Sequence, residues 1–120
     1  MLTKKTPDTI KAQLSIKAQG VENTLMLTYY NHAPEKYAAF VGNPENMKPP
    51  ESPGMNDAVM IAHINAALAL FVVKSFDDGT DEAFPLNKAG LVELEAHWPG
   101  TLLGIIRGYH QARGAEVEKN

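Results

Sequence analysis

The 120-residue sequence contains no cysteine, and it has no strong excess of charge of either sign. Without cysteine, disulfide bonds, thiol catalysis and cysteine-ligated zinc are excluded, which fits a reducing cytoplasm. The formal net charge is −3, and the longest basic run is the pair Lys4-Lys5. This balance argues against a protein that holds nucleic acid through the phosphate backbone.

Long hydrophobic runs are lacking as well. The longest, AVMIAHINAALALFVV at residues 58–73, is too short for a membrane span and contains His63 and Asn65. We therefore expect a buried helix there and no membrane partner. The N-terminal stretch MLTKKTPDTIKAQ lacks the apolar core of a signal peptide, so we expect a cytoplasmic protein.

Residues 10–30 show the alternation of a β-hairpin. Apolar residues recur at every second position from Ile10 to Ala18, with lysine, glutamine and serine between them. A turn at GVEN then leads to the β-forming run TLMLTYY. An isolated hairpin is barely stable in water, so this one must pack against the helices predicted downstream.

The next segment predicts a short helix and then a connector. APEKYAAF has Pro34 at its first helical position, with Tyr37, Phe40 and Val41 facing inward. Residues 42–56 contain four prolines and can continue neither a helix nor a central strand. A structureless segment of this length predicts a mobile loop.

Polar residues and breakers mark the ends of three further helices. Asn56 is a candidate N-cap for a helix running to about Lys74, and Asn87 for a second helix. Between these two lies the turn-rich acidic link SFDDGTDEAFPLN. Pro99 ends the second helix and begins the last one, which Gly114 terminates.

Together these elements predict one α+β domain over residues 1–120, an N-terminal β-hairpin packed against three or four helices. A hydrophobic content of 44% with 21% charged residues is ordinary for a single folded domain. The predicted divisions are the hairpin at 10–30, the mobile Pro-rich loop at 42–56, the helical part at 57–113 and a polar tail at 114–120.

The last predicted helix carries a row of glycines. Gly100, Gly104 and Gly108 lie four apart, and each interior glycine costs about 1 kcal/mol relative to alanine. A row without side chains allows another backbone to approach closely. The interpretation we favour is packing inside the chain, against the alanines of the helix at 58–73. The alternative is a contact between chains, which would make the protein a homo-oligomer.

The signals for a chemical site are weak. The acidic cluster at 77–82 has Glu82 and Lys88 where a calcium-binding loop needs glycine and glutamate. None of the four histidines forms a metal-binding pair, and no nucleophile elbow or phosphate-binding glycine loop is present. We therefore predict no metal, no cofactor and no enzymatic activity. The alternative is a small enzyme or ligand-binding protein that uses His63 and the acidic turn.

The C-terminal half carries short motifs in a particular order. The segment VKSFDDG is followed by an acidic turn, FPLNKAGLVELEAHWPG, a helix containing IIRGYHQA and a final KN. In this order and at this chain length, residues 55–120 resemble the tail assembly chaperones of lambda-like long-tailed phages. Phe76 departs from the family pattern, in which tryptophan is expected.

The resemblance implies a non-catalytic phage or prophage protein of the host cytoplasm. Such chaperones bind the tape measure protein and recruit tail tube protein subunits around it, and they are absent from the mature virion. The alternative within phages is a structural head–tail or tail-completion protein that remains in the particle.

No binding residues carry over from the family, so the candidate contact residues follow from residue type. Aromatic anchors often dominate interfaces, and the glycine row permits a close approach. The same residues are equally suited to a core. The candidates are Tyr29, Tyr30, Tyr37, Trp98, Gly104 and Gly108.

Overall fold

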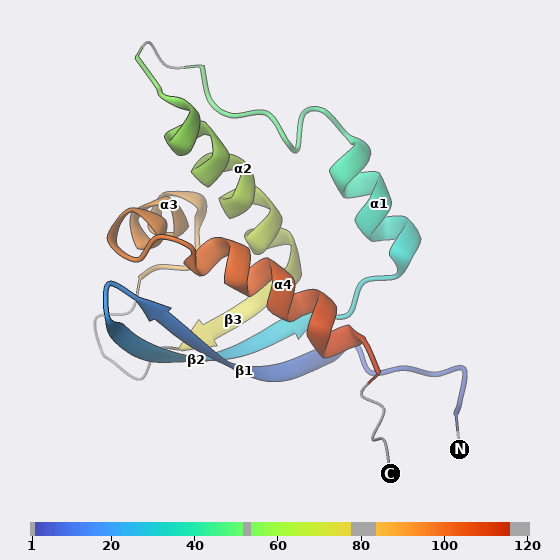
Figure 1. Cartoon of the computed structure of the whole chain (residues 1–120). Helices are drawn as coiled ribbons and strands as arrows, with labels where there is room; N and C mark the ends of the chain where they lie inside the picture. Colours follow the sequence, from blue (N-terminus) through green and yellow to red (C-terminus); the bar gives the residue numbers. More distant parts are fainter. Residues whose placement is uncertain (1, 52–53, 78–83, 116–120) are drawn as a thin grey trace.

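The computed structural model describes residues 2–51, 54–77 and 84–115. In these ranges three strands form one antiparallel sheet in the order β1-β2-β3, and the helices pack above one face of it or stand beside it (Figure 1). This is the predicted α+β fold, with an N-terminal hairpin packed on helices. The elements are β1 Thr9–Ala18, β2 Val21–Tyr30, α1 Pro34–Gly42, α2 Asp57–Val72, β3 Val73–Asp77, α3 Lys88–His97 and α4 Thr101–Arg113.

The hairpin predicted at 10–30 is confirmed. Its two-residue turn is formed by Gln19 and Gly20, whose φ values of 54° and 77° match the turn that follows the natural twist of a hairpin. The pairing of β1 with β2 then runs without a bulge from Ala18 opposite Val21 to the far ends of the strands. The alternation places the inward-facing residues of β2, Leu25, Leu27 and Tyr29, in the core.

A third strand was not predicted. The helix predicted to run to about Lys74 ends at Val72, and the chain continues directly as β3. β3 pairs antiparallel with β2, with Phe76 opposite Leu27, so the first residues of the predicted acidic link belong to the sheet. The physical reason is tertiary, because the second edge of β2 needs a hydrogen-bonding partner. Residues 78–83 of that link lie outside the described residues.

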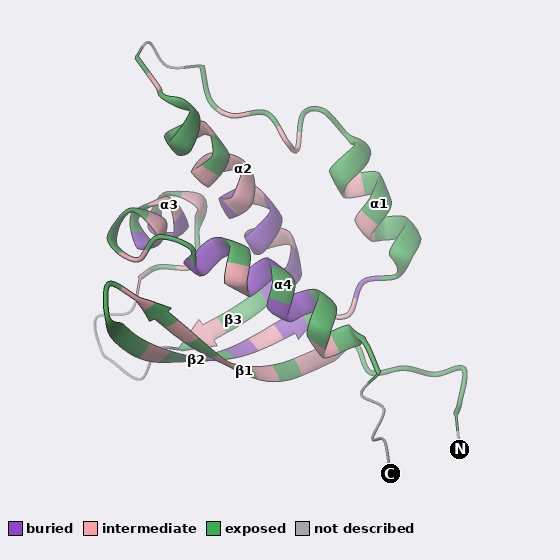
Figure 2. Cartoon of the chain, viewed as in Figure 1, coloured by how far each residue is buried: buried purple, intermediate pink, exposed green. Residues whose placement is uncertain are grey.

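Helix α1 begins at Pro34 as predicted, but it lies at the periphery and buries no residue (Figure 2). It is attached through rings, and the Phe40 ring stacks on Phe71 of α2 with centroids 4.1 Å apart. Val41 is 39% exposed, so the predicted inward position of this residue is wrong. The three residues share one face of the helix, but the contact with Phe71 is made by the rings of Tyr37 and Phe40. Mobility of the loop at 42–56 stays a prediction.

The asparagine N-caps are confirmed. Asn56 Oδ1 accepts a hydrogen bond of 2.9 Å from the Val59 amide, and Asn87 Oδ1 accepts one of 2.7 Å from the Gly90 amide. Each bond satisfies one of the amides that the first turn of a helix leaves without an internal partner. Local sequence therefore determines where α2 and α3 begin.

Helix α4 begins in a different way from the prediction. Its first residue is Thr101 and not Pro99, and its N-cap is Gly100, held at φ 95° where a side chain would be strained. The missing cap is supplied from α3, because the Glu95 carboxylate accepts from the Gly100 amide at 2.7 Å and from the Leu102 amide at 2.9 Å. A carboxylate at a helix N-terminus also interacts favourably with the helix dipole.

Gly104 and Gly108 face the hairpin. A Cβ built at Gly108 would lie 2.7 Å from the Tyr29 hydroxyl oxygen and 2.8 Å from a methyl of Leu14, whereas one at Gly104 would lie 3.1 Å from a methyl of Ile16. For Gly104 and Gly108 the packing inside the chain is confirmed, but the partner is the hairpin and not the helix at 58–73, and a Cβ at Gly100 would meet nothing within 4 Å. Gly108 is buried there, which leaves it no free surface for another chain.

We expect Gly108→Ala to destabilise the protein by about 1–3 kcal/mol, because the new methyl collides with the fixed Tyr29 hydroxyl. The gain in helix propensity, about 1 kcal/mol, is too small to offset this collision. Gly104→Ala meets only the flexible end of Ile16 and should shift the free energy of unfolding by less than about 1 kcal/mol. Urea unfolding followed by circular dichroism measures both changes.

Gly42→Ala is the matched control, since a Cβ at the end of α1 would meet nothing within 4 Å. This variant should be as stable as the wild type or slightly more stable. A Gly108→Ala protein with wild-type stability would contradict the close approach of α4 to the hairpin.

Candidate protein-binding surface

Tyr29, the first candidate contact residue, is a core residue with 0% exposure. Its hydroxyl donates a 2.8 Å hydrogen bond to the Ile105 carbonyl of α4. Its ring meets Tyr109 edge to face, with centroids 5.7 Å apart. Burial without a countercharge raises the pKa of Tyr29 above its ordinary value. Tyr29 therefore stabilises the fold and has no surface to offer a partner.

Tyr30 and Tyr37 belong to one aromatic cluster with His32 and Phe71. His32 stacks on Phe71 at 4.1 Å and on Tyr30 at 5.4 Å, and its Nε2 donates a 2.7 Å hydrogen bond to the Phe71 carbonyl. Tyr37 stacks on Tyr109 at 5.8 Å. The cluster thus attaches α1 to α2 and α4, and of its members Tyr30 keeps substantial exposure, at 39%.

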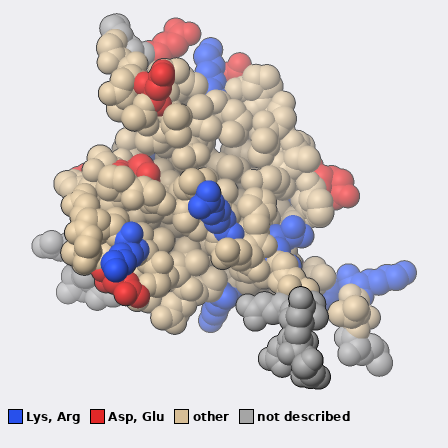
Figure 3. All heavy atoms as spheres, viewed as in Figure 1, with Lys and Arg blue, Asp and Glu red and all other residues tan. Residues whose placement is uncertain are grey.

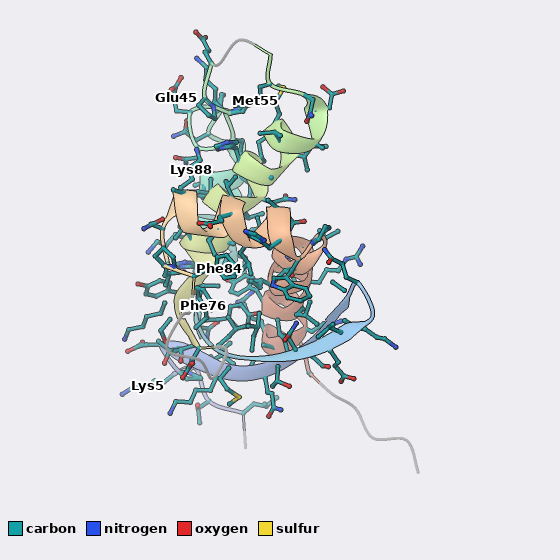
Figure 4. The ribbon with its side chains drawn as sticks, turned by 90° about the vertical axis from the view of Figure 1, so that its left-hand side faces the viewer. Lys5, Glu45, Met55, Phe76, Phe84 and Lys88 are labelled. Atoms are coloured by element: carbon teal, nitrogen blue, oxygen red, sulfur yellow. The ribbon has the colours of Figure 1, made fainter. Side chains whose placement is uncertain are left out.

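Trp98 lies away from this cluster, at the end of α3. It lines a small cavity of about 80 Å³ between the hairpin and α3. Phe84 also lines it, and Figure 4 shows Phe84 and Phe76 in the space between α3 and the sheet. The remaining lining residues are Ile16, Asn23, Leu25, Leu94 and Thr101. The structure therefore does not bring the four candidate aromatic residues to one surface.

An open apolar groove, which sequence reasoning missed, lies between the first half of α2 and α3. We call it the α2–α3 groove, and its lining residues are Asn56, Ala58, Val59, Ala62, Val92, Glu95, Ala96 and Pro99. Its walls come from two helices that pack against each other further along α2. Most of its lining residues have small or branched apolar side chains.

The two polar residues of the α2–α3 groove are already engaged. The Asn56 side chain caps α2, and both carboxylate oxygens of Glu95 accept hydrogen bonds from amides at the start of α4. The side-chain oxygens of these two residues are therefore occupied by hydrogen bonds within the chain. A binding partner would meet a surface that offers mainly apolar contact.

The first half of α2 exposes apolar side chains on more than one side, because Val59 lines the groove and Ile61 does not. Val59 is 38% exposed and Ile61 is 57% exposed, although α2 is hydrophobic on all sides. A helix that is apolar all round is normally enclosed, and here only the second half is. The sequence of residues 58–64 is rich in apolar side chains, but tertiary packing decides how many of them other elements cover. Among the described residues, no helix combines the length and hydropathy that crossing a bilayer requires.

Of the residues of the alternative chemical site, His63 and Asp77 are described, and they do not line a common hollow. The hollow beside Asp77 is lined by residues of the three strands, and His63 is not among them. His63 lies on α2, where its Nδ1 is buried without a hydrogen-bond partner within the described residues. Three or more histidine, aspartate or glutamate side chains with the geometry of a metal site do not occur in the described ranges. The acidic turn beyond Asp77 lies outside them.

We expect Tyr29→Phe to lower the free energy of unfolding by about 1 kcal/mol near pH 7, because it removes the hydrogen bond to Ile105. Because the pKa of Tyr29 is raised by folding, its contribution is complete below about pH 10 and is lost as the pH rises above that value. The difference between wild type and variant should therefore shrink by about 1 kcal/mol near pH 11. Urea unfolding at the two pH values measures it.

Tyr30→Phe removes the same hydroxyl from an exposed ring and serves as the control. Its stability should follow that of the wild type at both pH values. A difference between wild type and Tyr29→Phe that stays constant with pH would contradict the burial of the Tyr29 hydroxyl.

Comparison of the chain with protein-family models, curated proteins and solved structures finds no match.

Proposed function

We propose that this chain is a phage or prophage tail assembly chaperone without catalytic activity. In this role it binds the tape measure protein in the host cytoplasm, recruits tail tube protein subunits around it and leaves before the virion is complete. The observation that supports this proposal most is the half-covered helix α2, on which Val59 is 38% exposed and lines the α2–α3 groove. The family in this proposal comes from the resemblance of the motifs in residues 55–120 to tail assembly chaperones.

The chemistry of the surface fits an amphipathic helix as its occupant. Exposed apolar side chains on α2 and a groove of small residues beside them accept the apolar face of a helix at i, i+3, i+4 spacing. Tape measure proteins are very long and rich in helix, so they present many such faces. A single surface of this kind can hold one segment at a time while the remainder of the partner assembles.

Helix α1 and the Pro-rich segment form a cover that suits reversible binding. Described residues of the segment line a hollow together with α2, and the lining residues are Lys48, Pro49, Pro50, Glu51, Met55 and Met60. Figure 4 shows Glu45 and Met55 at the end of the molecule opposite the sheet. Methionine adapts to irregular partners, and α1 is attached by ring contacts without a buried residue of its own. Such a cover can shift at low cost when a partner binds.

We expect Val59→Asp to abolish co-purification of the chain with the tape measure protein of the same genome, because Val59 lines the groove. The new carboxylate would be buried without a partner when the apolar face of a helix binds there. The measurement is co-expression of the two proteins, affinity capture of this chain and quantification of the captured tape measure protein.

Met26→Asp is the matched control, because Met26 is 53% exposed and lies on the sheet, away from α2. This variant should capture the wild-type amount. Equal capture by both variants would exclude α2 as the binding surface, and no capture by the wild type would exclude the proposed function.

Mass spectrometry of purified virions tests the role against the structural alternative. We expect peptides of the tail tube protein in stoichiometric amounts and essentially none from this chain. Stoichiometric recovery of this chain from the particle would instead identify it as a head–tail or tail-completion protein.

A further inference from the structure

Strand β1 is an open edge of the sheet. The two-residue turn and the register direct the backbone groups of every second residue of β1 toward β2. The amides and carbonyls of Lys11, Gln13, Ser15 and Lys17 therefore point away from β2. Among the described residues, none of these backbone groups has a hydrogen-bond partner outside the hairpin. The edge is ten residues long and contains neither a proline nor a bulge.

The apolar cover of the sheet is incomplete at the same edge. On β2 the inward-facing residues are enclosed, with Leu25 at 4% and Leu27 at 2% exposure. On β1 the inward-facing Leu14 and Ile16 pack against the same core but remain only partly buried. The apolar surface between the sheet and α4 thus extends beyond β1, the edge strand. A further strand with apolar residues facing inward would complete it.

The charges around this edge are mainly positive. Lys11 and Lys17 lie on the outer face of β1, Arg107 is exposed on α4 above it, and the one carboxylate on the neighbouring part of β2 is Glu22, opposite Lys17. In Figure 3, blue side chains lie over α4 and along the hairpin, and the red atoms nearby lie beside the hairpin turn. Antiparallel pairing of two copies of β1 centred on Leu14 would set Lys11 opposite Lys17, which like charges oppose. Lysine on an edge strand commonly prevents such self-pairing.

We infer that the β1 edge accepts an extended segment of another protein as a fourth strand, and that this segment alternates acidic and apolar residues. Its backbone would pair with Lys11, Gln13, Ser15 and Lys17. Its apolar side chains would face α4, and its carboxylates would lie beside the two lysines on the outer face. This is strand addition with charge complementarity. The inference does not depend on the proposed function, because it concerns β1 and not α2.

The test uses a synthetic peptide of alternating glutamate and valine, as long as β1, added to the full-length chain. We expect its binding to shift the amide NMR signals of Lys11, Gln13, Ser15 and Lys17 and to slow their hydrogen exchange. The same peptide with alternate amides methylated cannot form the ladder and should not bind. Shifts of those four amides with the first peptide and none with the second support the inference.

Charge and backbone variants separate the two parts of the recognition. Lys11→Glu should weaken peptide binding by about five- to tenfold at low salt, and Lys74→Glu, with the same charge change on β3, by less than about twofold. Ser15→Pro removes an amide that points away from β2, so it should abolish binding while leaving the fold intact by circular dichroism.

Several results would overturn the inference. These are the absence of peptide binding to the wild type, equal binding of the methylated peptide, or equal weakening by Lys11→Glu and Lys74→Glu. Dimerisation of the wild type through β1, seen by light scattering and abolished by Ser15→Pro, would assign the edge to a second copy instead. Loss of tape measure binding in Val59→Asp would change none of these results, so the two proposals fail separately.

Discussion

The close contact of α4 with the hairpin at Gly108 is the constraint on which the rest of the structure depends. Because Gly108 has no side chain, the Tyr29 hydroxyl can reach across to donate to the Ile105 carbonyl. This contact seats α4 directly over β1 and leaves the space above β2 and β3 to α2. Any side chain at Gly108 would hold α4 away from the sheet and open the core at its centre.

Local signals predicted most of the secondary structure. The alternation in residues 10–30 determined the hairpin, and the caps Asn56 and Asn87 determined where two helices begin, because each signal acts within a few residues. The third strand could not be predicted in this way. Val73 continues an apolar run that favours helix, and it becomes extended because β2 needs a partner on its second edge. That need arises only once the hairpin is in place.

The glycine row and the aromatic candidates show where sequence reasoning ends. Gly100 adopts a positive φ, whereas Gly108 makes room for a tyrosine, and nothing in the spacing distinguishes these two causes. Likewise Tyr29 and Tyr30 are neighbours of the same type, yet the pleat turns one into the core and the other to the surface. The open side of α2 was visible as an excess of apolar residues, but which part stays uncovered is decided by the position of α3.

The polar side chains explain why the remaining surfaces suit polypeptide partners. Glu95, Asn56 and Asn87 each satisfy backbone amides at a helix start, and His32 satisfies a backbone carbonyl. These polar groups are used within the chain. The two surfaces proposed for binding differ from each other in kind. One is a face of apolar side chains on α2, and the other is a row of backbone amides and carbonyls along β1. In the two proposals, the first surface selects a partner by shape and apolar spacing, whereas the second selects an extended backbone and takes its specificity from charge.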